Sequence, residues 1–245
     1  LGAVGMYPFT VCSVVSYSVI PLFIFMGYVI LFSGVGSEFF ILARRLVGHI
    51  RGGLAMTTVA ASSGFGAVSG DVVSAAVTMS AISIPETREH NYHDKLVIGA
   101  ISGGANLSFI IPPSLGFILF GAVTSTSIGQ LFIAGILPGL LITLLLMALV
   151  YILCVIHPEW GPAVERSTWK ERIVAFKNSW VVLSTFLFVM GGIYLGIFTP
   201  TEAAAGGATF VLLIGLLRRK ITIKTIKFAA IETGLTTGMM ISSGN

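Results

Sequence analysis

The amino-acid sequence predicts an all-α, polytopic membrane protein. Of its 245 residues, 55% are hydrophobic and only 10% are charged, and the mean hydropathy is +0.97. A soluble domain carries about 25% charged residues, so this chain has too little charge to keep its surface in water. Apolar runs of about 20 residues, long enough to cross a bilayer as helices, recur along the chain. Lipid is therefore the expected solvent of the fold.

The apolar runs give the positions of the expected spans. These are Thr10–Phe32, Leu96–Ala122, Gln130–Ile156, Ser179–Phe198, Thr199–Leu217 and a last run that begins at Phe228. The amphipathic segment Ser37–Val47 fits either a helix in the membrane interface or a cytoplasmic extension of the first span. Residues 157–178 form a polar linker with two tryptophans, which suit the interface. The last run reaches Asn245 without a polar anchor, so we expect a piece of a longer protein.

The apolar stretch Gly53–Ile84 predicts a re-entrant helical hairpin. Each half has about 15–17 residues, which is short for a full crossing of the bilayer. Its middle is rich in Gly and Ser, which allow the backbone to turn. Irregular backbone at membrane depth is tolerated only where protein or a cavity surrounds it. The hairpin therefore marks a buried or cavity-lining part of the fold. We expect residues 1–245 to form one transmembrane domain.

The basic residues indicate the topology. The net charge is +4, and all 14 Lys and Arg lie within residues 44–51, 88–95, 166–177 and 218–227. If the hairpin returns the chain to its starting side, every one of these segments lies on the same side, which the positive-inside rule identifies as the cytoplasm. This segregation argues for membrane loops and against a nucleic-acid partner. The charge pattern thus predicts a membrane protein whose basic loops face the cytoplasm.

Two broken elements form the candidate site. The first is the hairpin tip, with Gly66, Ser69, Gly70 and Asp71; the second is the broken helix 96–122, with Asn106, Ser108, Pro112, Pro113 and Ser114. Proline lacks an N–H and disrupts the preceding helical turn, which would free carbonyls near residues 107–109. Discontinuous helices of this kind are the usual sign of a transporter site, with free oxygens for Na⁺. We expect Na⁺ to be held by Ser69, Asn106 and backbone carbonyls; the alternative is a plain proline kink satisfied by its neighbours.

Two acidic residues have alternative roles. Asp71 lies beside the tip, where it can ligate a cation or cap the second half of the hairpin. Glu202 follows Thr199 and Pro200 at the spacing of a capping box, which favours a structural role at the start of a helix.

Other function classes have less support. A membrane-embedded hydrolase needs a nucleophile with a base or a metal site, but His49, His90, His93 and His157 all lie in or beside loops. A passive channel needs polar residues along several spans, and the spans here are mostly apolar. We therefore expect no enzyme activity and no bound cofactor.

Five segments resemble a known family. They are Pro21–Gly27, Val47–Ala55, Phe65–Gly70, Ile110–Ser114 and Gly196–Ala205. In this order and at this spacing they are similar to the large membrane subunit of the tripartite ATP-independent periplasmic (TRAP) transporters, across nearly the whole chain. The nearest alternative is a related sodium–carboxylate elevator family.

The resemblance implies a sodium-driven elevator that imports organic acids, typically carboxylates or sialic acids. Its partners would be a periplasmic substrate-binding protein and a small membrane subunit. The family fold has inverted repeats, each with a hairpin and a broken helix. The second repeat would begin in residues 201–245, with its hairpin beyond Asn245.

The chain departs from the family pattern at both breaks. The family tip often reads Ser-Gly-Ser with an Asp some four residues later, whereas Asp71 here replaces the second Ser and Ala75 stands at the usual Asp. Before the two prolines the family often has Ser-Ser-Thr and Gly-Pro, where this chain has residues 104–106 and Ser108–Phe109. Asn106 still offers a side-chain oxygen in the place of the family's polar residues.

Overall fold

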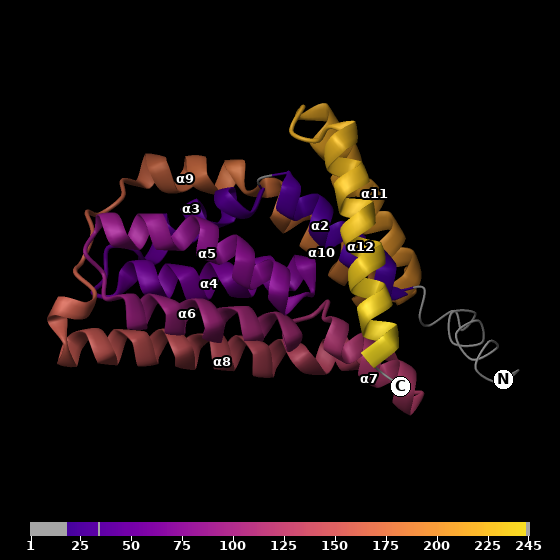
Figure 1. The fold of residues 1–245 in the computed structure, drawn as a ribbon, viewed down its shortest axis with the longest axis horizontal. Helices are drawn as coiled ribbons and strands as arrows, with labels where there is room; N and C mark the ends of the chain where they lie inside the picture. Colours follow the sequence, from indigo (N-terminus) through magenta and orange to yellow (C-terminus); the bar gives the residue numbers. More distant parts are fainter. Residues whose placement is uncertain (1–18, 34, 244–245) are drawn as a thin grey trace, which may run out of the picture.

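The computed structural model describes residues 19–33 and 35–243 and has an all-α architecture, as the sequence predicts (Figure 1). Over these ranges it contains helices and no strand. The first predicted span, Thr10–Phe32, lies partly outside the described residues; its described part is α2 (Val19–Phe32). Helix α3 (Val35–Val47) turns away from α2 by 71°. An interfacial helix and a bent cytoplasmic extension of the first span both agree with this angle, so both stay predictions.

The predicted hairpin is formed by α4 (Gly53–Ser69) and α5 (Val72–Glu89), which are joined by a two-residue turn (Figure 1). The expected end at Ile84 is wrong, because α5 continues through Pro85. Two contacts hold the turn after the proline. The Thr87 hydroxyl donates to the Ser83 carbonyl at 2.7 Å, and Glu86 pairs with Arg44 of α3.

The next predicted span is broken. It consists of α6 (Asp94–Asn106), the short 3₁₀ helix η2 (Leu107–Phe109), an irregular segment at 110–114 and α7 (Leu115–Thr124). The long helix α8 (Ile128–Ile156) then runs back along α6 (Figure 1). With 13 and 10 residues, α6 and α7 are each too short to cross a bilayer alone.

The segment 157–178, which we expected to be only a polar linker, contains the short 3₁₀ helix η3 (Pro158–Trp160) and the helix α9 (Trp169–Asn178). Thr168 and Glu171 form a capping box that starts α9, a signal that the sequence reading missed. Helix α9 lies alongside α3 (Figure 1).

The chain ends with α10 (Trp180–Tyr194), α11 (Pro200–Leu217) and α12 (Ile223–Ser243). Thr199 and Glu202 form the predicted capping box of α11, with Pro200 at its first position. Among the described residues, α8 and α11 are long and apolar enough to cross a membrane, and there are up to four such spans if each bent pair, α2 with α3 and α9 with α10, is one span.

Two hydrophobic clusters form the core. The larger one joins α2 to the hairpin tip, α10 and α11, and includes the fully buried side chains of Phe23, Met26 and Phe65. The smaller one joins the base of the hairpin to α6 and α8. Both clusters meet the hairpin, so α4 is the central element that carries the candidate site.

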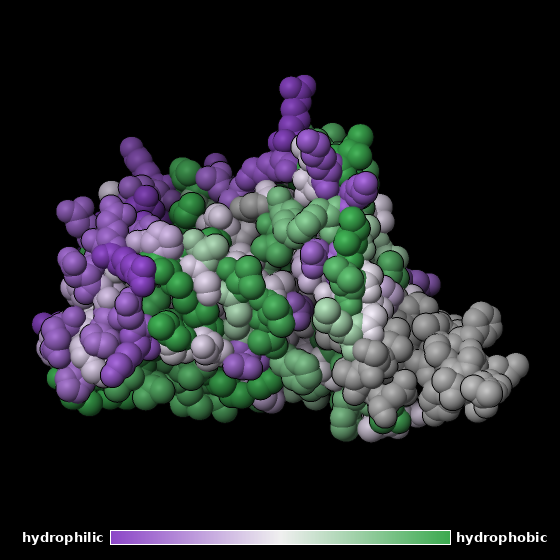
Figure 2. All heavy atoms as spheres, viewed as in Figure 1, coloured by the Kyte–Doolittle hydropathy of each residue, from purple (hydrophilic) through white to green (hydrophobic). Residues whose placement is uncertain are grey.

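Charged residues gather on one part of the surface. Figure 2 shows hydrophilic residues over α9, the α5–α6 connection and the α11–α12 connection, whereas the outer face of α8 is hydrophobic. Ion pairs join the basic segments: Arg45 of α3 pairs with Glu171 of α9 at 3.3 Å, and Arg218 pairs with Glu38 of α3 at 3.2 Å. The fold therefore brings together the segments that the charge pattern assigns to one side of the membrane.

Candidate functional site

The hairpin tip is a tight turn with a charged cap. Gly70 has φ 65°, a left-handed conformation that side chains other than Gly rarely adopt, and its N–H donates to the Gly66 carbonyl at 2.8 Å. Asp71 follows and accepts a hydrogen bond from the Ser74 N–H at 2.7 Å through Oδ2. Asp71 therefore has the capping role, one of the two that its position allows; a role in ion binding stays a prediction.

The proline break satisfies part of its own backbone. The Leu107 carbonyl accepts from the N–H groups of Ile110 and Ile111 at 2.9 and 2.8 Å, and the Ser114 hydroxyl donates to the Phe109 carbonyl at 2.5 Å. The expectation of free carbonyls near 107–109 is thus wrong for two of these three residues. Turns and a side chain supply the hydrogen bonds that the helix loses at the prolines.

The tip and the break are in direct contact. The Leu115 N–H at the start of α7 donates to the Gly70 carbonyl at 3.3 Å. Ser114, which is fully buried, caps the same helix by accepting from the N–H groups of Gly116 and Phe117. A Cβ atom on Gly70 would lie 3.0 Å from the Pro113 carbonyl oxygen. The structure therefore brings together Gly70, Pro113 and Ser114 of the predicted site.

Glycines allow the backbone of α4 to lie in contact with the neighbouring elements. A Cβ atom on Gly66 would lie 2.1 Å from Ser108 Oγ and 2.7 Å from Ser108 Cα. On the opposite side, a Cβ atom on Gly27 of α2 would lie 2.8 Å from the Ser69 carbonyl oxygen. The tip is therefore held between α2 and the break. Gly27 ends the segment Pro21–Gly27 of the sequence analysis, but only its contact with Ser69 explains why a glycine is needed there.

Three buried serine hydroxyls in this region have no hydrogen-bond partner among the described residues. They belong to Ser62, Ser69 and Ser108, which are at most 1% exposed. Ser62, Gly66 and Ser69 recur at the spacing of one helix face of α4. Ser62 lies against Gly104 of α6 and Gly66 against Ser108 of η2, whereas Ser69 lies against Gly27 of α2. An unpaired buried polar group costs about 1–3 kcal/mol, which calls for a partner such as water or an ion.

Asn106 lies apart from this cluster. Its side chain is exposed, and Nδ2 donates to the Ser102 carbonyl at 2.8 Å, one turn back along α6. The structure therefore does not bring the Asn106 side chain to the tip. Ser62 is the residue that the sequence reading did not single out; the available signal was its i, i+7 relation to Ser69 on a Gly- and Ser-rich helix.

A largely apolar cavity of about 300 Å³ lies against the break, between α4 and α8. Ser63 and Pro112 line it together with Thr143 of α8. The Thr143 hydroxyl has its one proton within reach of two acceptors, the Gly139 carbonyl at 2.8 Å and Ser63 Oγ at 3.2 Å. This link fixes α8 against the first half of the hairpin.

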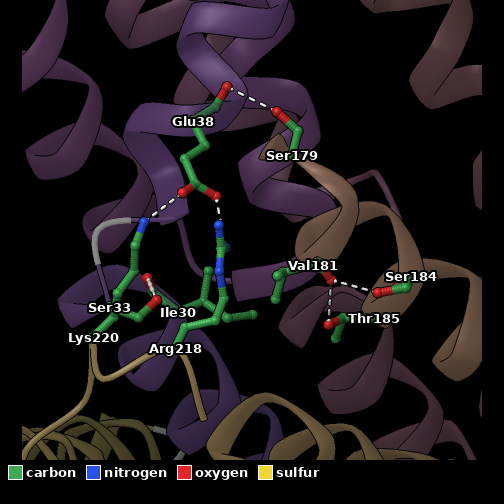
Figure 3. Close-up of polar contacts among 9 residues, drawn as sticks. All are labelled: Ile30, Ser33, Glu38, Ser179, Val181, Ser184, Thr185, Arg218 and Lys220. Carbon is green, nitrogen blue, oxygen red and sulfur yellow. Dashed lines mark hydrogen bonds and ion pairs between the residues drawn. The ribbon is translucent and has the colours of Figure 1, made fainter. Parts of the chain in front are cut away.

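A charged junction joins α3 to the helices outside the hairpin (Figure 3). The Glu38 carboxylate pairs with Arg218 at 3.2 Å and also with Lys220, at the end of α11. The Ser179 hydroxyl, at the start of α10, donates to the Glu38 carbonyl oxygen at 2.9 Å. One residue of α3 thus holds two connections on the basic side of the protein.

The titratable groups do not form a metal centre. Among the described residues, no three His, Cys, Asp or Glu side chains are grouped so that they could hold a metal ion. His93 and His157 instead each stack against Trp160, with ring centroids 5.0 and 4.7 Å from that of the tryptophan.

Comparison with known proteins identifies the family. Residues 4–242 match the family model of the tripartite ATP-independent periplasmic transporter, DctM component. The chain is 37% identical over 222 residues to the ectoine/5-hydroxyectoine TRAP transporter large permease protein UehC of Ruegeria pomeroyi, which covers 90% of this chain and 51% of that protein. It is 34% identical to the C4-dicarboxylate TRAP transporter large permease protein DctM of Pseudomonas aeruginosa, covering 91% and 52%.

A third relative is the sialic acid TRAP transporter permease protein SiaT of Haemophilus influenzae, 32% identical over 90% of this chain and 36% of that protein. The chain thus spans about half the length, or less, of these three relatives. All three are permeases, in agreement with the prediction that the chain is not an enzyme. The matching family model, these relatives and the hairpin packed on a broken helix show that the chain belongs to the DctM component of the TRAP transporters.

Proposed function

We propose that this chain is part of the large permease subunit of a sodium-driven importer of small carboxylates. A periplasmic binding protein delivers the substrate, and a small membrane subunit supports the permease. The three relatives are named for ectoine, sialic acid and C4-dicarboxylates, and each of these compounds carries a carboxylate. The proposal places the protein in the inner membrane, with its basic segments in the cytoplasm.

The contact between the hairpin tip and the break is the observation that supports this function most strongly. The Gly70 carbonyl is bonded to the first N–H of α7, and Gly66 packs on Ser108, so the tip and the break are in direct contact. Nearby, the hydroxyls of Ser69 and Ser108 are buried without partners among the described residues. Hydroxyl and carbonyl oxygens are suitable ligands for Na⁺, and broken helices are where transporters place such ligands.

Sodium binding would couple the ion gradient to transport by closing this contact. An ion shifts a conformational equilibrium only if it binds one state better than the other. An ion held by oxygens of both the tip and the break binds best when the two are together. The proposed elevator then moves the hairpin and the broken helix across the membrane with their cargo. The Asn106 side chain is exposed and bonded to Ser102, so its proposed role in binding substrate or ion rests on the sequence alone.

The test is the sodium dependence of uptake by the full-length permease, reconstituted with its small subunit and binding protein. Ser108→Ala and Ser69→Ala should each raise the sodium concentration that gives half-maximal uptake. Asn106→Ala should do the same if its amide oxygen is a ligand. Ser184→Ala is the matched control, because it removes a hydroxyl that only donates to the Val181 carbonyl within α10.

Normal insertion is checked by the amount of folded permease in the membrane. If both Ser69→Ala and Ser108→Ala retain the sodium dependence of the Ser184→Ala control, the tip does not bind the coupling ion. If uptake of a carboxylate is independent of sodium in the unmodified protein, the proposal of a sodium-driven importer is wrong.

A further inference from the structure

A second, separate groove lies on the outer side of the molecule, between α6 and α8. It has a volume of about 190 Å³ and is lined almost entirely by apolar side chains. On α8 its wall consists of Leu146, Leu149 and Leu153. The outer face of α8 around it is hydrophobic and exposed, so this side of the molecule is suited to lipid.

Two glycines keep this groove open. Gly99 and Gly103 lie one helical turn apart on α6. A Cβ atom on Gly99 would meet nothing within 4 Å, and one on Gly103 would meet only the Leu146 methyl groups, at 3.5 and 3.7 Å. The neighbouring Gly104 is different, because a Cβ atom there would lie 2.8 Å from Ser62 Cβ. Gly104 is needed for helix packing, whereas Gly99 and Gly103 leave space.

The polar end of the groove carries a positive charge. Lys95 lines it there and is exposed, with no ion pair to another described residue. The adjacent Asp94 pairs with Arg88 at 3.5 Å, so it does not neutralise Lys95. The Trp160 ring lines the same end and stacks against the rings of His93 and His157. A tryptophan beside a lysine is typical of the level of the lipid headgroups.

The dimensions fit one leaflet of a membrane. Lys95 and Gly103 are eight residues apart on α6, which corresponds to a rise of about 12 Å. Half of the hydrocarbon core of a bilayer is about 15 Å. A chain that enters from the headgroup level beside Lys95 and Trp160 therefore follows the groove through most of one leaflet.

We propose that this groove binds one acyl chain of a phospholipid, with the lipid phosphate at Lys95. The apolar walls remove the chain from contact with other lipids, and the unpaired ammonium group attracts the negative headgroup. The site lies on a different face of α6 from Gly104 and is independent of the sodium site.

The test measures lipid binding to the full-length permease by native mass spectrometry, with phosphatidylglycerol as the probe. Gly103→Leu fills the groove and should abolish the specifically bound lipid; Gly99→Leu is a second variant with the same purpose. Gly191→Leu is the matched control, because it adds a side chain in α10 where a Cβ atom has no neighbour within 4 Å. Lys95→Ala should weaken binding about fivefold, the effect of one cation at a membrane surface.

Three comparisons decide the outcome. Phosphatidylglycerol should bind better than diacylglycerol to the unmodified protein, and this preference should disappear in Lys95→Ala but persist in a Lys224→Ala control. Inorganic phosphate should not displace the lipid, because the chain supplies most of the contact. The proposal is overturned if Gly103→Leu and Gly99→Leu bind as much lipid as Gly191→Leu, or if the unmodified protein binds none because a protein segment covers the groove. Neither result bears on sodium-driven uptake.

Discussion

The contact between Gly66 and Ser108 gives the sharpest prediction. Gly66→Ala places a Cβ atom 2.1 Å from Ser108 Oγ, which a rotation of the serine can relieve, and 2.7 Å from Ser108 Cα, which no rotation can. Carbon atoms in contact are normally about 3.5–4.0 Å apart. Helix α4 and the 3₁₀ helix η2 must therefore separate by roughly 1 Å, a distance that follows from these contact values.

The energetic effect has two parts of opposite sign. Forcing a methyl group into a packed interface costs about 1–3 kcal/mol. Replacing a helical glycine with alanine contributes up to about 1 kcal/mol of stability. Gly191→Ala in α10 has only the second effect, because a Cβ atom there meets nothing within 4 Å. The difference between the two variants therefore isolates the packing cost, and we expect Gly66→Ala to be about 1–3 kcal/mol less stable than Gly191→Ala.

Thermal unfolding of the full-length permease in detergent measures this difference in stability. The unfolding midpoint of Gly66→Ala should lie a few degrees below that of Gly191→Ala. Adding Ser108→Gly to Gly66→Ala removes the close contacts with Oγ and Cβ and should recover part of the loss, since neighbouring sites are not additive. Gly66→Ala should also reduce substrate uptake. Equal midpoints for the two alanine variants would refute the contact between the hairpin and the break.

Three further predictions concern topology, the charged junction and the isolated chain. Cysteines introduced into residues 87–95, 166–177 or 218–224 of the permease should resist an impermeant thiol reagent added from the periplasm, because these segments are basic; strong labelling of any one contradicts the topology. Glu38→Gln should lower the free energy of unfolding by about 1 kcal/mol, a small effect because the ion pair between Glu38 and Arg218 is partly exposed. The loss should be smaller when Arg218→Gln and Lys220→Gln are already present. Equal losses with and without these two changes would show that the charges are not coupled. Residues 1–245 alone, reconstituted with the partners and a sodium gradient, should not transport, because we propose that the site is built from two repeats. Uptake by this piece would reject the two-repeat site.

Local sequence signals were sufficient for most of the helices. The hairpin turn follows from Gly70 and the Gly- and Ser-rich middle of the segment, and α11 begins at the capping box that Thr199 and Glu202 predict. Both signals act within a few residues of the chain, so the sequence alone predicts where the hairpin turns and where α11 begins. Pro85 shows the limit of this reasoning. A proline disfavours a helix locally, but the pairing of Glu86 with Arg44 of α3 helps to hold the turn that follows it.

The candidate site was only partly predictable. The sequence marks both breaks, because Gly, Ser and Pro interrupt apolar runs where a bilayer penalises unpaired backbone. The sequence does not show which carbonyl and side-chain oxygens are left without a hydrogen bond in the fold. The Phe109 carbonyl accepts a hydrogen bond from Ser114, and the Asn106 amide donates to the Ser102 carbonyl. The Ser62 hydroxyl, which the sequence pattern did not single out, is buried and has no partner among the described residues.

By itself the sequence determined the all-α fold, the hairpin and the broken helix. These properties depend on the balance of apolar and charged residues and on short-range backbone preferences, which are encoded locally. Only the tertiary structure decided that Gly66 rests on Ser108 and that Gly70 bonds to the start of α7. Such contacts join residues about 40 positions apart, and they depend on how closely glycines allow two helices to approach, which no local pattern specifies.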